Sequence, residues 1–244
     1  MILENAEHRP MLCLGMILES LPPQCGDVRI ANWDWDRVKG EERLASTIWG
    51  RYHVEGTFDG KSFTATDVDP PQKEDPIFDS DPIGTPCSEP EGGWEVPDPN
   101  RAGQADVNAS NAAVRHDPAF AGLWIEDLDA AGEDATEDQG EILLNVAFTA
   151  NLERHEQGLR EHWSGPLCVT KHDWSLRRLQ RIQSEELRLV TRRLGIQQLF
   201  TDIDVEDNVV EVGVVVIDHK DREAIEERFG KGAVRILAAL QPAT

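Results

Sequence analysis

The feature that most constrains the fold is a pattern that occurs twice in the second half of the chain. Apolar runs begin at Glu141 and Asn208, 67 positions apart, and each is followed by a helical stretch and a strand that begins after glycine. Self-similarity at a fixed spacing indicates that one supersecondary unit is used twice. Helical stretches over 102–115 and 176–194 precede the two runs, so each unit is expected to have the order α-β-β-α-β.

Several local signals support these units. The β-α-β step of each should join parallel strands by a right-handed crossover. The run 209–217 is almost entirely apolar, as expected for a strand covered on both faces. Ser175 and Gly195 flank the helix of the second unit as N-cap and terminating residue. Asn151 and Asp218 stand at equivalent positions before the next helices, where both are good N-caps.

Residues 11–68 are expected to be all-β. Asp59-Gly60 lies between two alternating runs within 51–68, which is the strongest short-range signal for a hairpin. About five short strands must hide their edges. The sequence therefore predicts a small closed β-barrel of the oligonucleotide/oligosaccharide-binding type. That fold name does not imply the corresponding ligand.

Residues 69–100 contain eight prolines among acidic residues and glycines. Such a composition favours extended conformations and buries too little apolar surface to order itself. It predicts an interdomain linker, with Cys87 and Trp94 as the places where it can be held. The predicted organisation is α+β, with the barrel in 1–68, the acidic linker in 69–100, and the tandem units in 101–172 and 173–244.

The chain is strongly acidic, and the charge is unevenly distributed. Of the formal net charge of −22, segments 67–99 and 127–141 carry −9 and −7. A field of this sign disfavours nucleic acid and anionic membranes as partners. No run of 18 apolar residues exists, so no membrane insertion is expected. The N-terminus lacks a signal-peptide pattern, which makes the cytoplasm the default compartment.

Four cysteines, Cys13, Cys25, Cys87 and Cys168, allow three disulfide pairings. Cys13 and Cys25 are close enough in sequence to be bridged across a hairpin. Buried free thiols and disulfides are both compatible with the sequence. Bridged cysteines would place the protein outside the cytosol.

Two groups of side chains are candidates for ligand binding. Trp33 and Trp35 share one strand face and form a platform for a sugar or peptide, or else their indoles fill the end of the barrel. Asp127, Asp129 and Asp138 match part of a calcium loop, but position five lacks an oxygen and position twelve is Asp instead of Glu. A solvated acidic loop is the alternative for these aspartates.

The helical stretch over 176–194 is rich in arginine, with Arg177, Arg178, Arg181, Arg188, Arg192 and Arg193. These side chains hold phosphate or an acidic partner, meet the acidic loops of the same chain, or form the solvated side of a core helix. No Ser/His/Asp or Cys/His set has a recognisable catalytic context, and no glycine-rich phosphate loop is present. The sequence therefore predicts no catalytic residue and no cofactor.

The second unit resembles the pro-regions of alpha-lytic-type secreted serine proteases, in its stretches 176–183, 208–214 and 232–236. The first unit resembles them over 120–125 and 142–146. The resemblance covers about residues 105–240, and it implies a role in assisting the folding of, and inhibiting, a protease. No nucleophile motif of such a protease is present in the chain.

The whole chain also resembles a family of uncharacterised proteins from high-GC bacteria. The shared segments are Leu-Cys-Leu-Gly ending at Gly15, Pro-Pro-Gln-Cys ending at Cys25, and Gly-Pro-Leu-Cys ending at Cys168. This resemblance implies no particular chemistry.

The predicted function is that of a non-enzymatic protein-interaction or structural module. A protein or peptide partner would dock by strand addition to exposed sheet edges. The alternative is a small-ligand or calcium-binding module that uses the tryptophans or the acidic loops. A third hypothesis is a hydrolase, which would have a cleft with a strongly perturbed titratable residue. The sequence does not indicate an oligomeric state.

Overall fold

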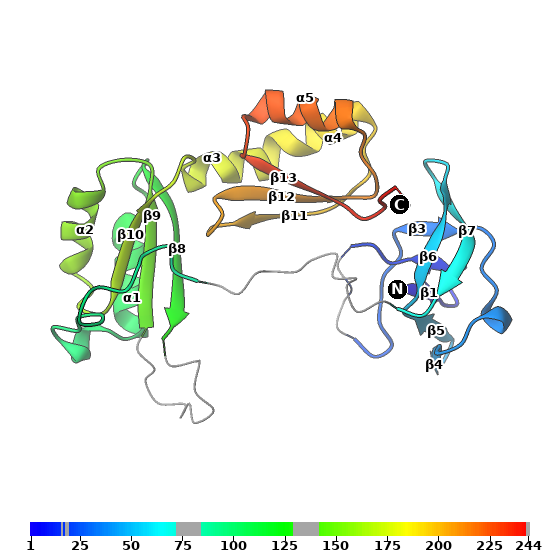
Figure 1. The fold of residues 1–244 in the computed structure, drawn as a ribbon, viewed down its shortest axis with the longest axis horizontal. Helices are drawn as coiled ribbons and strands as arrows, with labels where there is room; N and C mark the ends of the chain where they lie inside the picture. Colours follow the sequence, from blue (N-terminus) through cyan, green and yellow to red (C-terminus); the bar gives the residue numbers. More distant parts are fainter. Residues whose placement is uncertain (16, 18–19, 72–83, 129–141, 243–244) are drawn as a thin grey trace.

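Three separate β-sheets form the framework of the protein. The computed structural model describes residues 1–15, 17, 20–71, 84–128 and 142–242. Within them lie one seven-stranded sheet and two three-stranded sheets. In Figure 1 the N-terminal sheet is at one end, the unit built around 104–171 is at the other, and the unit built around 176–238 lies between them.

The N-terminal sheet has the strand order β4-β5-β1-β2-β3-β7-β6. Its strands are β1 (Ile2–Glu4), β2 (Met11–Leu12), β3 (Val28–Ile30), β4 (Glu42–Leu44), β5 (Thr47–Gly50), β6 (His53–Phe58) and β7 (Ser62–Asp69). β6 and β7 form the predicted hairpin, with Phe58 opposite Phe63 and Gly60 at a φ of 91° in the turn. A short 3-10 helix, η1 (Trp35–Arg37), follows β3.

The predicted closed barrel is wrong, because this sheet is open: its edge strands β4 and β6 are not paired with each other. The reason is visible in the core. Ile2, Val28 and Phe63 pack in one cluster with Val215, which is 0% exposed. Leu199, Ala239 and Leu240 pack against the same cluster. The apolar face that a barrel would enclose within itself is covered here by residues from the far end of the chain.

The first three-stranded unit contains α1 (Gln104–Val114), β8 (Phe120–Asp127), β9 (Ile142–Phe148), α2 (Leu152–Arg160) and β10 (Leu167–Lys171), preceded by the 3-10 helix η2 (Pro99–Arg101). β9 is the central strand, antiparallel to β8 and parallel to β10. Both helices cover one face of this sheet. Val107 and Val114 from α1 and Leu159 from α2 pack there with β-strand residues such as Phe148.

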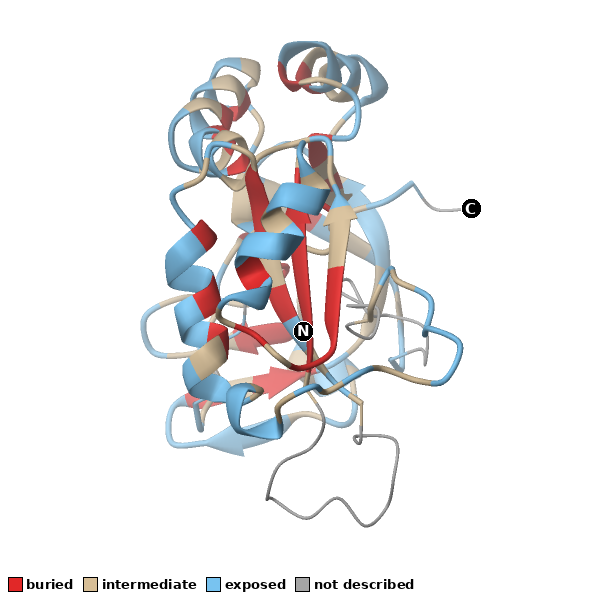
Figure 2. Cartoon of the chain, turned by 90° about the vertical axis from the view of Figure 1, so that its left-hand side faces the viewer, coloured by how far each residue is buried: buried red, intermediate tan, exposed pale blue. Residues whose placement is uncertain are grey.

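The second three-stranded unit has the same order of elements. It contains α3 (Leu176–Arg181), the π-helical segment η3 (Ile182–Glu186), α4 (Leu187–Leu194), β11 (Gln198–Asp204), β12 (Val209–Val214), α5 (His219–Phe229) and β13 (Val234–Ala238). β12 is central, antiparallel to β11 and parallel to β13. Leu179, Leu187 and Ile225 pack on its valines. Figure 2 shows buried residues on the strands and on one side of the helices.

The described part of the linker is held against the first unit. Cys87 and Cys168 of β10 form a disulfide, with Cα atoms 5.8 Å apart. The other disulfide, between Cys13 and Cys25, lies within the N-terminal region, with Cα atoms 5.5 Å apart. The indole nitrogen of Trp124 donates to the carbonyl of Gly84 at 3.1 Å. The linker is therefore attached at two points to the sheet that it precedes. The predicted domain boundaries stay a prediction.

None of the helices in the described ranges combines the length and the apolar character that crossing a membrane requires.

Candidate functional site

The helical segment 176–194, formed by α3, η3 and α4, contains the six arginines. One of its turns, η3, has one residue more than a turn of an α-helix. Ile182 and Leu187 are both 0% exposed, five positions apart, where an α-helix would bury positions three or four apart. The π-helical segment η3 supplies this spacing, because a π-helix bonds residue i to residue i+5. The extra residue keeps both side chains in the core and sets which residues of α4 face β11.

Two side-chain contacts fix this helical segment to its neighbours, and a third lies within it. Glu186 accepts a hydrogen bond from Arg178 at 2.9 Å and forms a salt bridge with Arg228 of α5 at 3.5 Å. Gln183 donates to the main-chain carbonyl of Thr201 on β11 at 3.3 Å. The C-terminal half of the segment, α4, is thereby positioned over the beginning of β11.

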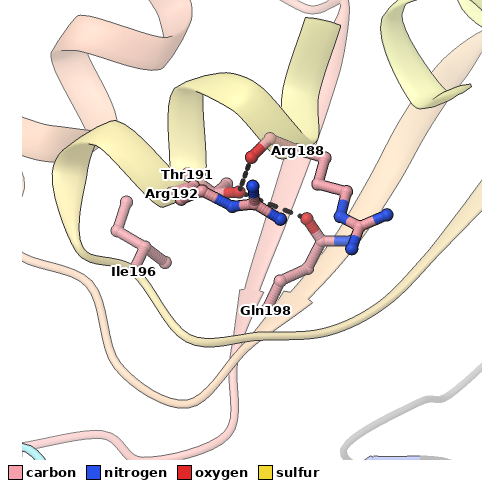
Figure 3. A pocket seen from close by; sticks show the side chains of 5 residues that line it. All are labelled: Arg188, Thr191, Arg192, Ile196 and Gln198. Carbon is pink, nitrogen blue, oxygen red and sulfur yellow. Dashed lines mark hydrogen bonds between the residues drawn. The ribbon is translucent and has the colours of Figure 1, made fainter. Parts of the chain in front are cut away.

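A pocket of about 290 Å³ lies between the last turn of α4 and the start of β11. Figure 3 shows the residues that line it, which are Arg188, Thr191, Arg192, Ile196 and Gln198. Arg188 and Arg192 are exposed and one helical turn apart, so their side chains are neighbours on α4. Thr191 is 2% exposed and forms the inner wall.

The hydroxyl of Thr191 contacts the side chain of Gln198. Its Oγ1 lies 3.1 Å and 3.3 Å from the carbonyl oxygens of Leu187 and Arg188, and 3.3 Å from Oε1 of Gln198. The single hydroxyl hydrogen is shared among these acceptors. In Figure 3 the side-chain amide of Gln198 points toward the guanidinium groups of Arg188 and Arg192.

The guanidinium groups of Arg188 and Arg192 have no hydrogen-bond or salt-bridge partner among the described residues. Other arginines of the same unit are paired: Arg178 with Glu186, and Arg235 with Asp204, Asp207 and Glu211. The stretch 176–194 contains six arginines and two glutamates, a local charge of +4 in a chain of −22. The pocket is therefore a cationic place on an acidic protein.

The main chain around the pocket offers no free donors from the helix terminus. Gly195, with a φ of 75°, ends α4. Its N–H donates to the carbonyl of Arg192 at 3.2 Å, and the N–H of Ile196 donates to that of Thr191 at 2.8 Å. Any anion in this pocket would therefore be bound by side chains.

A second group of polar side chains lies where the two three-stranded units meet. Val205, in the turn between β11 and β12, packs on Ala121, Trp124 and Ala147 of the first sheet. His172 stacks on Trp124, with ring centroids 6.1 Å apart and 16° between the planes. This contact joins the turn of one unit to the open face of the other.

Burial shifts two titratable groups at this junction. The pKa of His172 is lowered, because burial disfavours the imidazolium more than nearby hydrogen bonding and acidic groups favour it. The pKa of Glu206 is raised, first by burial and then by neighbouring carboxylates that include Glu126. Nε2 of His172 and Oε2 of Glu126 are buried and have no hydrogen-bond partner within the described ranges. Packing accounts for this burial: His172 stacks on Trp124 and is hydrogen-bonded to the main chain of Val205, and Glu206 accepts from the N–H of Gly84 at 3.4 Å.

The two candidate tryptophans lie far in sequence from the arginine-lined pocket and do not line it. The rings of Trp33 and Trp35 are 5.5 Å apart edge to face, and that of Trp33 is 5.1 Å from Tyr52. Trp35 donates from its indole nitrogen to Glu4 at 2.7 Å. Burial, followed by the charge of Glu41, raises the pKa of Tyr52. These rings pack on one another beside the N-terminal core, and a ligand-binding role for them stays a prediction.

The calcium-loop candidates are placed only in part. Asp127 ends β8, whereas Asp129 and Asp138 lie outside the described residues. Among the residues that are described, no group of three or more His, Cys, Asp or Glu side chains is arranged to hold a metal ion. All four cysteines are in the two bridges given above.

Sequence reasoning identified the arginines of α4 but not the other walls of the pocket. Thr191, Ile196 and Gln198 did not stand out, since their role depends on the position of β11 beside α4. One signal was available: the buried stripe of the helix skips from Ile182 to Leu187. That irregular spacing indicates a π turn, which is frequently found at functional sites.

The pocket has the composition of a binding site for an anion. It presents two guanidinium groups and one amide, and its lining contains no carboxylate, imidazole or thiol. In comparisons with known proteins, no family model matches the chain and no curated protein matches it.

Proposed function

We propose that the protein is a non-enzymatic protein-interaction module that docks an acidic segment of a partner protein on the arginine-rich side of α4. The observation that carries this proposal is the arginine-lined pocket. Arg188 and Arg192 share it, and no acidic side chain in the described part of the chain neutralises them. Acidic side chains are abundant in this protein, so two neighbouring unpaired arginines leave a surface that is complementary to an external acidic segment.

The surface of α4 also contains an apolar contact point. Leu189, next to Arg188, is 65% exposed. Single exposed ion pairs contribute only about 0–1 kcal/mol each, so binding here depends on several contacts acting together. An apolar side chain flanked by arginines is a suitable addition, because arginine is enriched at protein interfaces and the fully buried centre of an interface is more apolar than the rest of the surface. The charged part of the interaction should weaken as salt is added.

Docking through side chains fits this surface better than strand addition at the adjacent edge. The carbonyl of Thr201 on β11 accepts from Gln183, and the N–H of Ile203 is bound by the carboxylate of Asp202. Side chains thus occupy two main-chain groups of the strand that an added strand would need. The partner segment would therefore contact α4 and the pocket instead of extending the sheet.

The two disulfides support an oxidising compartment as the place of action, because structural disulfides persist there and are rare in the cytosol. A protein-binding role is also what the resemblance to protease pro-regions implies for residues 105–240. A partner with an acidic surface segment in the same compartment completes the proposal.

The test is the binding of a fluorescent poly-glutamate peptide to the purified oxidised chain, followed by anisotropy. Replacing Arg188 and Arg192 by Gln should weaken binding at least tenfold, since each removes a charge-assisted contact. The matched control is the Arg37→Gln, Arg43→Gln pair in the N-terminal region, which removes the same charge from two exposed ion pairs. Equal loss in both double variants, or no binding of the peptide by the unmodified chain at low salt, would disprove the proposal.

A further inference from the structure

We propose that the arginine-lined pocket selects a side-chain carboxylate over a phosphate. Gln198, oriented by Thr191, is the residue that donates a hydrogen bond to this carboxylate. This inference rests on the proposed function, because it specifies the chemical group of the partner that enters the pocket. Three observations support it: the orientation of the amide, the lack of main-chain donors, and the position at the end of a helix.

The amide of Gln198 is held by its oxygen. Oε1 lies 3.3 Å from the hydroxyl of Thr191, a side chain that is 2% exposed and anchored on α4. Oε1 shares the hydroxyl hydrogen with the carbonyl oxygens of Leu187 and Arg188, and an amide whose oxygen faces this hydroxyl turns its NH2 group in the opposite direction. Nε2 of Gln198 has no partner among the described residues, and in Figure 3 it lies on the side of the Arg188 guanidinium. The amide thus adds a neutral donor beside a cationic one.

Phosphate sites in proteins commonly use main-chain N–H groups, at the N-terminus of a helix or in a nest. Here the pocket lies at the C-terminal end of α4, where the helix dipole is negative and disfavours added negative charge. The N–H groups of Gly195 and Ile196 are already bonded within the terminating turn. A dianion would meet this unfavourable potential without main-chain donors, whereas a carboxylate carries half the charge and suits planar guanidinium and amide donors.

The arrangement favours acidic side chains over the carboxylate of a chain terminus. Arg188 and Arg192 are one helical turn apart and line one pocket, so both guanidinium groups can contact the same carboxylate. A chain terminus offers a single carboxylate, whereas an acidic segment offers several. The ligand is therefore a single Asp or Glu side chain of an acidic segment, and Gln198 donates to that carboxylate.

The experiment uses the oxidised full chain and three peptides of one length, with affinities measured by anisotropy at low salt. The first is acidic and C-terminally amidated, the second has Gln for each Glu and a free C-terminus, and the third carries phosphoserines at the same net charge as the first. The inference predicts that the first peptide binds at least tenfold more tightly than either of the others. Equal or tighter binding of the second or the third would overturn it.

Two variants test whether Gln198 donates to the carboxylate. Gln198→Met keeps the length of the side chain and removes the amide donor, and it should weaken the acidic peptide about tenfold. Thr191→Val removes the hydroxyl that holds Oε1 and should weaken it severalfold, without lowering the thermal midpoint as a folding defect would. Gln180→Met, at an exposed position of α3, is the matched control and should bind as the unmodified chain does.

The failure of this inference is distinguishable from the failure of the proposed function. If the Arg188→Gln, Arg192→Gln double variant no longer binds the acidic peptide while Gln198→Met and Thr191→Val bind it normally, α4 is the docking surface. The proposed hydrogen bond from Gln198 to the carboxylate is then wrong. If the unmodified chain binds none of the peptides, both proposals are wrong.

Discussion

Ile182 and Leu187 are packed in the same core cluster and are both fully buried, although they are five positions apart along one continuous helical segment. The π turn between them is the reason that both reach the sheet. It also determines that Leu189, two positions on, faces away from the core.

We expect this helical register to have a measurable energetic consequence. Leu187→Ala should lower the free energy of unfolding by about 2–5 kcal/mol, because it removes a buried side chain and leaves a cavity. Leu189→Ala, at a residue that is 65% exposed, should change it by less than about 0.5 kcal/mol. Urea unfolding of the two variants is the measurement. A regular α-helix with another register would bring the two costs close together, and that result would contradict the π turn.

The disulfides should differ in their contribution to stability. Cys87 and Cys168 are 81 positions apart, whereas Cys13 and Cys25 are 12 apart. Closing the longer loop restricts the unfolded chain more, with typical contributions of about 2–5 kcal/mol. Replacing Cys87 and Cys168 by Ala should therefore destabilise the protein more than replacing Cys13 and Cys25. Thermal unfolding of both double variants checks this order, and an intact mass that is unchanged by reductant would show that the bridges are absent.

Asn145 and Asn208 should respond in opposite ways to the same substitution. Asn145 is 0% exposed, and neither its Oδ1 nor its Nδ2 has a hydrogen-bond partner in the part of the chain that the structure describes. Asn145→Leu keeps the branched shape and removes the buried polar atoms, so it should raise stability by about 1–2 kcal/mol. Asn208 exchanges two hydrogen bonds with the main chain of Trp174, at 2.7 and 2.8 Å, and has a φ of 55°.

Asn208→Leu should therefore destabilise the protein, through lost hydrogen bonds and a left-handed backbone that suits Asn better than Leu. Chemical denaturation of both variants gives the comparison. Destabilisation by Asn145→Leu would mean that the amide has a stabilising partner, such as a bound water.

The junction between the two three-stranded units should make stability depend on pH through His172. Its pKa is lowered in the folded protein, so the unfolded chain binds the proton first as the pH falls. Stability should therefore decrease as the pH falls through the ordinary histidine range near about 6.5, and continue to decrease until the folded protein is also protonated. Glu206, whose pKa is raised, acts with the opposite sign but in the lower carboxyl range.

Thermal midpoints measured between about pH 7.5 and pH 5.5 test this dependence. His172→Gln should remove part of the decrease, because glutamine does not titrate. An identical pH dependence in the variant would show that His172 does not contribute.

The elements that depend on neighbouring residues were predictable from the sequence. The hairpin at Gly60, the N-cap Ser175, which accepts from the N–H of Arg178, and the terminating Gly195 are all found in the structure. Asp218 also caps its helix, through Asp221. Asn151 does not: it has a φ of 58° and makes no side-chain capping bond. Its position before a helix was right, but the entry of the chain into that helix depends on the preceding turn.

The features that depend on distant residues were not predictable in this way. The barrel was expected because short strands need closed edges, yet the cover for this sheet comes from Val215 and Leu240. The pocket requires Gln198 to lie beside Thr191, and that proximity follows from how β11 packs under α4. Local patterns identified the arginines, whereas the partners that complete the site come from tertiary packing.

The cover that Val215, Ala239 and Leu240 give to the N-terminal sheet has a consequence for biosynthesis. The ribosome synthesises the N-terminal strands before Val215, Ala239 and Leu240, which cover them. Until these residues emerge, the apolar face of the N-terminal sheet is exposed on the nascent chain and is a surface for chaperone binding. A truncation that removes Ala239 and Leu240 would leave part of this face exposed in the folded protein.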